Sequence, residues 1–452
     1  MEKGGKTMVK RLCALALATA MILLACVQTG PAPGEGAPET GQKQELEVFD
    51  PATYTREMML EDYDFFWTTL EENCATFDLI EQATRIDLEQ VKQEYRARIE
   101  TTQDGEAETF VRIMSDLNQE FRSFAHISVE EPVSYYRMMD GVYWENTVKK
   151  ELYESDQVQA FYQWEADLPY YRQQLESAQQ ASALEEDGEG ELDNSVIEEN
   201  IQLSRQGDIA VVRLKSLYFY GEELNQVIIE KLRTFCRENL DAQHFIIDIT
   251  GNPGGSSLIW SEGLDPLWAG KVFFREEVAA YKQGSVNVQM WDGWPENDPD
   301  VELRPISDLS TMDYPKLDMQ SLEGCDGIAI RTEVDDYTHV ENPDGQEFEG
   351  RVWILTDRRV ASSSEMLARF GKESDLCTLV GTQTGGMGGT MAQPMVMAAA
   401  MPNCGMLIQY APFYFINEDG TCNDIEGTHP DIEIGPEEDP MTRCLQEIAK
   451  LG

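Results

Sequence analysis

The chain has 452 residues, of which 83 are acidic and 35 are basic, so its formal net charge near neutral pH is −48. A protein this negative repels nucleic acids and anionic lipid head groups, which excludes both as direct partners. Its nine cysteines show no Cys-x-x-Cys or Cys/His spacing. No metal site and no cofactor is therefore predicted, whereas one or two disulfides remain open.

The first 26 residues are predicted to be a lipoprotein signal peptide. Basic residues precede an apolar run from Leu12 to Ala25, which is shorter than the ~18 residues of a membrane-spanning helix. The run ends in Leu23-Leu24-Ala25-Cys26, which resembles a bacterial lipoprotein box, and this resemblance implies that Cys26 is lipidated. A plain signal peptide with an incidental cysteine is the alternative. The expected location is the bacterial cell surface or periplasm, with the lipid as the only membrane anchor.

Three further segments precede the main body of the chain. Residues 27–48 are rich in Pro, Gly, Glu and Gln and are predicted to be a disordered tether. Residues 49–130 are predicted to be an N-terminal helical domain, because apolar residues recur there at helical spacing. These residues include Tyr63, Phe66, Trp67, Leu70, Phe110, Ile113, Met114 and Leu117. Residues 131–205 are predicted to be a connecting region with a flexible acidic insertion at 179–200.

Residues 206–440 alternate between strand and helix patterns, which predicts an α/β core with a parallel or mixed sheet. The predicted strands lie at 209–214, 244–249, 352–356, near 379 and at 395–399, and the predicted helices at 227–239 and 364–370. The long segment 261–350 is expected to form a lid or a cleft wall, and 441–452 a C-terminal tail.

Two strands of this core end in turns that can carry chemistry. After the apolar strand His244 to Ile249, the sequence Gly251-Asn252-Pro253-Gly254-Gly255 lets backbone N–H groups approach a ligand with no Cβ in the way. After the strand 352–355 comes Ala361-Ser362-Ser363-Ser364-Glu365 at the start of a helix. A serine there can present its hydroxyl beside free backbone amides. On this segment alone, helix capping is the simpler interpretation, because Ser-x-x-Glu is also the capping-box pattern.

Together the two motifs resemble the paired motifs of the C-terminal processing (tail-specific) serine peptidase family. The resemblance implies a crotonase-like or Clp-protease-like core, with Ser362 as the nucleophile. It also implies an oxyanion hole formed by the amides of Gly254 or Gly255 and of Ser363. Many members use a lysine as the base, but this chain has Met387 at the corresponding position, and methionine cannot accept a proton.

The branch that resembles tricorn protease and the interphotoreceptor retinoid-binding proteins uses a histidine and a glutamate instead. The segment around His126 resembles the family's Leu-x-Asp-x-His-Thr segment, which implies that His126 is the general base. The segment Glu426-Gly427-Thr428-His429-Pro430-Asp431 resembles Glu-Gly-x-x-Pro-Asp, which implies that Glu426 orients the histidine. His429 is an alternative base, although its place before a proline favours a turn role.

Two functions follow from these patterns. The first is a surface-anchored serine endopeptidase that hydrolyses polypeptides by a Ser-His-Glu mechanism. The second is a non-catalytic peptide- or ligand-binding lipoprotein on the same fold, suggested by the missing lysine and the altered histidine segment. The sequence leaves the oligomeric state open.

Overall fold

The structure is a computed structural model. It describes residues 48–451 except 142–145, 176–193, 220–221, 292, 295–297, 390, 392–394 and 436. The chain divides into two units, Met1–Leu46 and Glu47–Gly452. The signal peptide, Cys26, nearly all of the predicted tether and most of the acidic insertion therefore lie outside the described residues. Within the described ranges, no helix is long and apolar enough to cross a membrane.

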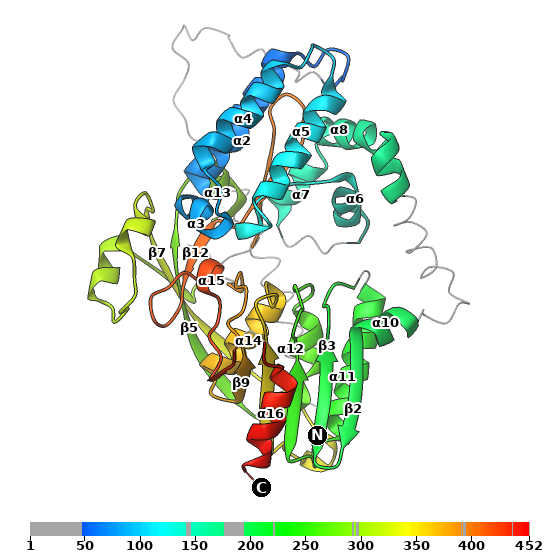
Figure 1. Cartoon of the computed structure of the whole chain (residues 1–452), viewed down its shortest axis with the longest axis vertical. Coiled ribbons are helices and arrows are strands. Elements are labelled where there is room, and N and C mark those ends of the chain that lie inside the picture. The colour runs from blue at the N-terminus through cyan, green and yellow to red at the C-terminus, as the bar shows by residue number, and fades with distance from the viewer. Residues whose placement is uncertain are drawn as a thin grey trace, which may run out of the picture. The chain divides into compact units, whose positions relative to one another are not determined.

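The described chain begins with a set of helices (Figure 1). They are α2 (Arg56–Asn73), α3 (Ile80–Thr84), α4 (Leu88–Glu100), α5 (Ala107–Glu120), α6 (Pro132–Gly141), α7 (Thr147–Tyr153), α8 (Asp156–Ala166) and α10 (Asn194–Asn200), with 3-10 turns η1 (Phe77–Leu79) and η2 (Phe124–His126). Their starts follow ordinary capping chemistry: the side chain of Thr55 accepts a hydrogen bond from the amide of Met58, and Asp87 does the same for α4.

A six-stranded sheet forms the α/β core, in the order β13-β9-β8-β4-β3-β2. Its strands are β2 (Ile201–Gln206), β3 (Ile209–Leu214), β4 (His244–Asp248), β8 (Arg351–Thr356), β9 (Cys377–Gly381) and β13 (Ile432–Glu433). All neighbours are parallel except β2 and β3. The apolar runs of β4 and β8 are almost wholly buried, as expected for central parallel strands. The expectation of a mixed α/β fold is confirmed.

Helices cover both faces of this sheet. On one face, α11 (Glu222–Glu238), α12 (Leu258–Gly263) and α14 (Ser363–Glu373) share a buried apolar cluster with the sheet. On the other face, α16 (Pro440–Ala449) packs Cys444 and Ile448 against Trp353 and Leu355 (Figure 1). The segment predicted as a C-terminal tail is therefore a packed helix.

Two antiparallel sheets complete the fold. The four-stranded sheet has the order β12-β5-β7-β6, and the three-stranded sheet has the order β1-β11-β10. Their strands are β1 (Ser128–Val129), β5 (Val272–Tyr281), β6 (Val301–Arg304), β7 (Gly327–Asp336), β10 (Met397–Ala400), β11 (Leu407–Tyr410) and β12 (Phe413–Ile416). The remaining elements are α13 (Ser285–Trp291), α15 (Asn423–Glu426), η3 (Asp265–Leu267), η4 (Ile306–Thr311), η5 (Met319–Leu322) and η6 (Pro343–Gly345). The segment expected to form a lid or cleft wall thus supplies most of the four-stranded sheet.

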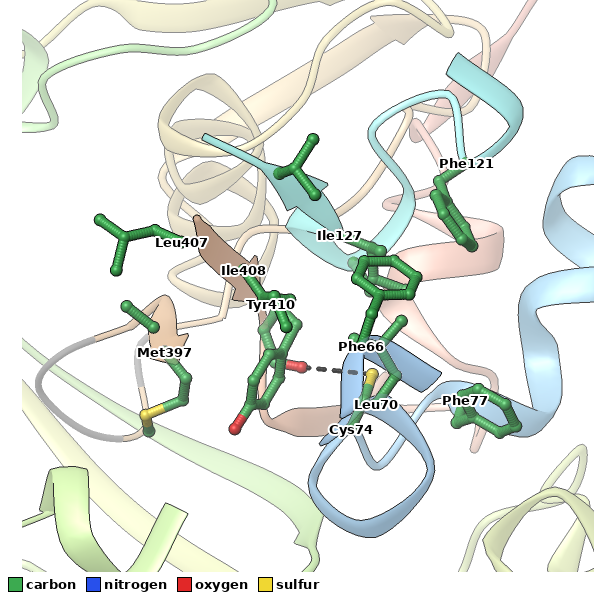
Figure 2. Packing of buried hydrophobic residues seen from close by; sticks show 14 of the residues in the cluster. Phe66, Leu70, Cys74, Phe77, Phe121, Ile127, Met397, Leu407, Ile408 and Tyr410 are labelled. Atoms are coloured by element: carbon green, nitrogen blue, oxygen red, sulfur yellow. Dashed lines mark hydrogen bonds between the residues drawn. The ribbon is translucent and has the colours of Figure 1, made fainter. Parts of the chain in front are cut away.

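The N-terminal helices share one core with strands from the far end of the chain. Phe66, Leu70 and Ile127 pack with Leu407 and Ile408 in a single buried cluster (Figure 2). The short strand β1 pairs with β11 in antiparallel register, with Ser128 opposite Gln409. The predicted helical segment is therefore not packed on its own, and its last turn, which carries His126, is fixed by residues near the C-terminus.

Candidate active site

Ser362 lies where strand β8 gives way to helix α14. Its backbone is left-handed, with φ 55° and ψ −125°, a conformation that costs energy for a residue with a Cβ. It occupies the N-cap position, yet its side chain makes no capping hydrogen bond. The backbone is held there because the Ser362 amide donates to the carbonyl of Gly386 (3.0 Å). The hydroxyl of Ser362 is thus not used to cap the helix.

Glu365 does not complete a capping box either. Its Oε1 accepts hydrogen bonds from Asn423 Nδ2 (2.9 Å) and Thr428 Oγ1 (2.7 Å). Glu365 is fully buried, and burial raises the pKa of its carboxyl above the usual value. The simpler interpretation of the Ser-x-x-Glu pattern is therefore wrong here: Glu365 anchors the segment 423–428 to α14 instead.

The glycine turn lies directly beside Ser362. A Cβ on Gly254 (φ 107°) would be 2.9 Å from the Cβ of Ser362 and 3.1 Å from the amide nitrogen of Ser363. A Cβ on Gly255 (φ 132°) would be 2.0 Å from the carbonyl oxygen of Leu217. Only glycine fits at both positions without rearrangement, because the space and the left-handed backbone both exclude a side chain.

Two of the three predicted oxyanion-hole amides are free to bind a ligand. The amide of Gly254 already donates to Asn252 Oδ1 (2.9 Å). The amides of Gly255 and Ser363 have no hydrogen-bond acceptor among the residues that the structure describes. Because Ser363 is the first residue of α14, its N–H also carries the positive end of the helix dipole. Gly255 and Ser363 are thus the pair that can stabilise a developing oxyanion.

His126 ends the 3-10 turn η2, and its backbone is left-handed, with φ 53°. The turn is tied to the C-terminal strands, because the amide of Ala411 donates to the carbonyl of Ala125 (2.6 Å). The side chain is only partly exposed. Burial lowers the pKa of the imidazole, which favours the neutral form that can accept a proton. Its buried Nδ1 has no hydrogen-bond partner in the described part of the chain.

The structure brings Ser362 and His126 together in one pocket of about 40 Å³, room for a few water molecules. The other lining residues are Met366, Met387, Gly389, Met395, Val396, Ala411, Phe415 and Asp424. Met387, predicted from the sequence to replace the family's lysine, is thus part of this pocket. No lysine is present among the described lining residues.

Glu426 and His429 do not line the pocket of Ser362. Glu426 Oε2 accepts from Gln383 Nε2 (3.0 Å) and lies 3.9 Å from His429 Nε2, and both side chains are about two-fifths exposed. His429 lines a different cavity, of about 170 Å³, together with Arg369 and Lys372. Glu426 therefore makes no hydrogen bond or ion pair to His126 among the described contacts.

Asp424, which no sequence pattern indicated, does line the pocket of Ser362. Its side chain is only 8% exposed, and its Oδ2 has no hydrogen-bond partner within the described ranges. Burial raises the pKa of this carboxyl to about 7; the charge of Arg369 lowers it and that of Glu365 raises it further. Asp424 lies two residues before Glu426, the acid that the sequence predicts. Residues two apart on a helical turn point in nearly opposite directions, however, so Asp424 and Glu426 cannot both face the pocket.

The described residues contain no group of three or more His, Cys, Asp or Glu side chains that could hold a metal ion. The cysteines of the described chain are all free thiols. They are Cys74, Cys236, Cys325, Cys377, Cys404, Cys422 and Cys444, and all but Cys325 are buried.

The comparison with protein families decides which family this arrangement represents. A model of peptidase family S41 matches residues 208–434, half of the chain, including the glycine turn, Ser362 and Asp424. The chain belongs to peptidase family S41. His126 precedes the matched range, and the structure places it in the pocket of Ser362.

Other comparisons place the S41 chain among solved structures with low similarity. A lipoprotein from Streptococcus agalactiae is 12% identical, with 87% of this chain and 97% of that chain covered and a TM-score of 0.44. Mature CPAF is 12% identical, with 84% of this chain and 92% of that chain covered and a TM-score of 0.43. No curated protein matches the sequence.

Proposed function

We propose that this S41 chain is a serine peptidase that cleaves polypeptides, with Ser362 as the nucleophile and His126 as the general base. One observation carries the proposal. Ser362 is held in a strained backbone conformation with a hydroxyl that caps nothing, and it shares a pocket with a partly buried histidine. Strained residues of this kind concentrate at functional sites, where the geometry serves the reaction.

The chemistry follows from the positions of these groups. Neutral His126 accepts the proton of the Ser362 hydroxyl as the oxygen attacks the carbonyl carbon of the scissile peptide. The resulting oxyanion accepts hydrogen bonds from the amides of Gly255 and Ser363. His126 then returns its proton to the leaving amine, the C–N bond breaks and an acyl-enzyme remains. A water molecule, deprotonated by the same imidazole, releases the product acid and restores Ser362.

The walls of the pocket define which peptides fit. Met366, Met387 and Phe415 give it an apolar lining, and methionine side chains adapt their shape to different occupants. We therefore expect a small or medium apolar side chain next to the bond that is cut. The net charge of −48 makes acidic polypeptides poor substrates, because they are repelled on approach.

A fluorophosphonate probe and a fluorogenic peptide library test the proposal together. The wild-type protein is expected to be labelled, and Ser362→Ala to lose both labelling and hydrolysis. His126→Ala is expected to lower kcat by at least about 10³-fold. His429→Ala, a matched change at the alternative base, is expected to stay within about twofold, because His429 lies at a different cavity. Equal labelling of Ser362→Ala would remove Ser362 as the nucleophile.

The second candidate function is a non-catalytic peptide- or ligand-binding lipoprotein. It is favoured by Met387 in the pocket of Ser362, where the resemblance implies a lysine in many members, and by Glu426 accepting a hydrogen bond from Gln383 rather than pairing with His126. Peptide binding without probe labelling or turnover would support this function over a peptidase.

Attachment to the bacterial surface by lipid on Cys26 remains part of either proposal. Metabolic labelling with a fatty-acid analogue, lost in Cys26→Ser, tests it. Release of the wild-type protein into the soluble fraction without lipid would contradict it.

A further inference from the structure

Two buried polar atoms in the pocket of Ser362 have no partner among the described residues. They are Nδ1 of His126 and Oδ2 of Asp424. Buried polar atoms are almost always hydrogen-bonded in folded proteins, so two such atoms in one pocket need an explanation. One is a nitrogen that can donate, and the other is a carboxylate oxygen that can only accept when ionised.

We propose that Asp424, rather than Glu426, is the carboxylate that orients His126 and stabilises its protonated form during attack by Ser362. This inference rests on the peptidase mechanism proposed above and names a positioning residue for it. Catalytic hydrogen bonds are often long in an unliganded site and tighten when substrate binds, so the two atoms need not be paired in the resting protein.

The backbone next to Asp424 is fixed relative to Ser362. Asn423 Nδ2 donates to Glu365 on α14 (2.9 Å), and Asn423 Oδ1 accepts from the amide of Gly388 (3.1 Å). A Cβ on Gly386 would be only 1.9 Å from the carbonyl oxygen of Asn423, which shows how closely the two loops pack. The helix that presents the nucleophile and the turn that presents Asp424 therefore move as one unit.

Glu426 has a different task in the same turn. Its side chain is held by Gln383, and Gln383 Oε1 in turn accepts from Arg358 Nη2 (2.8 Å). This chain of contacts ties the end of α15 to the loop after β8. Glu426 thus holds the turn in position. Rotating its side chain toward His126 would break the contacts that keep the turn in place.

The surroundings of Asp424 favour the ionised form of its carboxyl only when a cation lies beside it. The titratable groups near it are Glu365 and Arg369 from α14, Tyr414 from β12, Cys74 after α2 and Cys422 before α15, and His126 from η2 lines the same pocket. Arg369 is the one permanent cation of this set, but it is already paired with Glu277 (2.7 Å) and with Glu373 (3.1 Å). The imidazolium that forms on His126 during attack would supply the missing charge.

The decisive experiment compares Asp424→Asn with Glu426→Gln, since each removes one charge and keeps the shape of the side chain. Asp424→Asn is expected to lower kcat by about 10²- to 10⁴-fold with KM within about twofold, because an amide cannot stabilise the imidazolium. Glu426→Gln is expected to change kcat by less than about threefold. Asp424→Glu, which keeps the carboxylate, should recover part of the lost activity.

The pH dependence separates a positioning role from a purely structural one. In the wild type, ionised Asp424 and neutral His126 are both required. Because burial lowers the pKa of His126, kcat/KM should rise with pH through the raised pKa of Asp424, about 7. In Asp424→Asn the residual activity should depend on His126 alone, and its acidic limb should move to lower pH. Glu426→Gln should leave the limb unchanged.

Two outcomes would overturn the inference. One is wild-type kcat and an unchanged acidic limb in Asp424→Asn, while Ser362→Ala and His126→Ala are inactive; the peptidase proposal would then stand without Asp424. The other is a larger loss in Glu426→Gln than in Asp424→Asn, which would return the role to Glu426. Activity retained in Ser362→Ala is a different failure, because it removes the peptidase mechanism itself.

Discussion

The ion pair between Glu277 and Arg369 offers a quantitative test of how the site is supported. Glu277 lies on β5 and Arg369 on α14, the helix that begins at Ser362, and their side chains are 3% and 6% exposed. Arg369 Nη1 also donates to the carbonyl of Gly388 (3.2 Å), on the loop that lines the pocket. The substitution Glu277→Gln removes the charge and keeps the volume.

The expected loss in the free energy of unfolding follows from the burial of this ion pair. Removing one partner of a buried pair costs about 3–5 kcal/mol, because the remaining charge is left without compensation. Arg369 cannot lose its proton, but it keeps Glu373 as a second partner, so we expect the lower end, about 3 kcal/mol. A folded unit of about 400 residues has an unfolding entropy of roughly 0.8 kcal/mol/K, so Tm should fall by about 3–4 °C.

Differential scanning calorimetry at neutral pH measures this shift directly. Glu302→Gln is the matched control, since Glu302 pairs with Arg304 (2.8 Å) on the same sheet but is 63% exposed. The control should not change Tm measurably. The double variant Glu277→Met/Arg369→Met should recover part of the loss, because well-packed apolar side chains can replace a buried ion pair.

The reasoning would be refuted if Glu277→Gln lowered Tm no more than Glu302→Gln does. It would also be refuted if the fall in Tm of the double variant equalled the sum of the falls in Tm of the two corresponding single variants. Either result would mean that the charge of Arg369 is satisfied without Glu277, and that β5 does not hold α14 in place.

Three further predictions use the geometry of the pocket. Gly254→Ala should abolish labelling of Ser362, since its Cβ would lie 2.9 Å from the Cβ of Ser362. Gly207→Ala also puts a Cβ on a left-handed backbone (φ 60°), but that Cβ would have no neighbour within 4 Å, so this variant should still be labelled. Burial raises the pKa of Asp424 from 3.8 to about 7, so the stability it contributes is present below about pH 4 and is lost as pH rises through 7; the Tm advantage of wild type over Asp424→Asn should shrink accordingly between pH 5 and 8. Met366→Ala should shift cleavage toward larger apolar side chains in the peptide library, because Met366 lines the pocket.

The sequence predicted those parts of the site that depend on short stretches of chain. Apolar runs with turn residues after them mark buried parallel strands, which is why β4 and β8 were located to within a few residues. The position of Ser362 and of the glycine turn follows from the same local patterns. Whether Ser362 caps the helix could not be decided from sequence, because a capping box and a nucleophile turn use the same residue types.

The identity of the acid in the pocket depends on information that the sequence does not display. Asp424 and Glu426 belong to one four-residue helix, and the direction of each side chain is set by contacts of Asn423 and Gln383 with distant elements. The position of His126 likewise depends on distant residues, because strand β1, two residues after it, pairs with β11. Long-range packing, not local pattern, therefore completes the site.

Ala411 shows how the N-terminal helices and the C-terminal strands depend on each other. Its amide donates to the carbonyl of Ala125, and its carbonyl accepts a hydrogen bond from the thiol of Cys74 (3.5 Å). Ala411 also lines the pocket of Ser362. One residue thus joins the end of α2, the turn of His126 and the pocket wall. Loosening of α2 would therefore displace His126 and reshape the pocket at the same time.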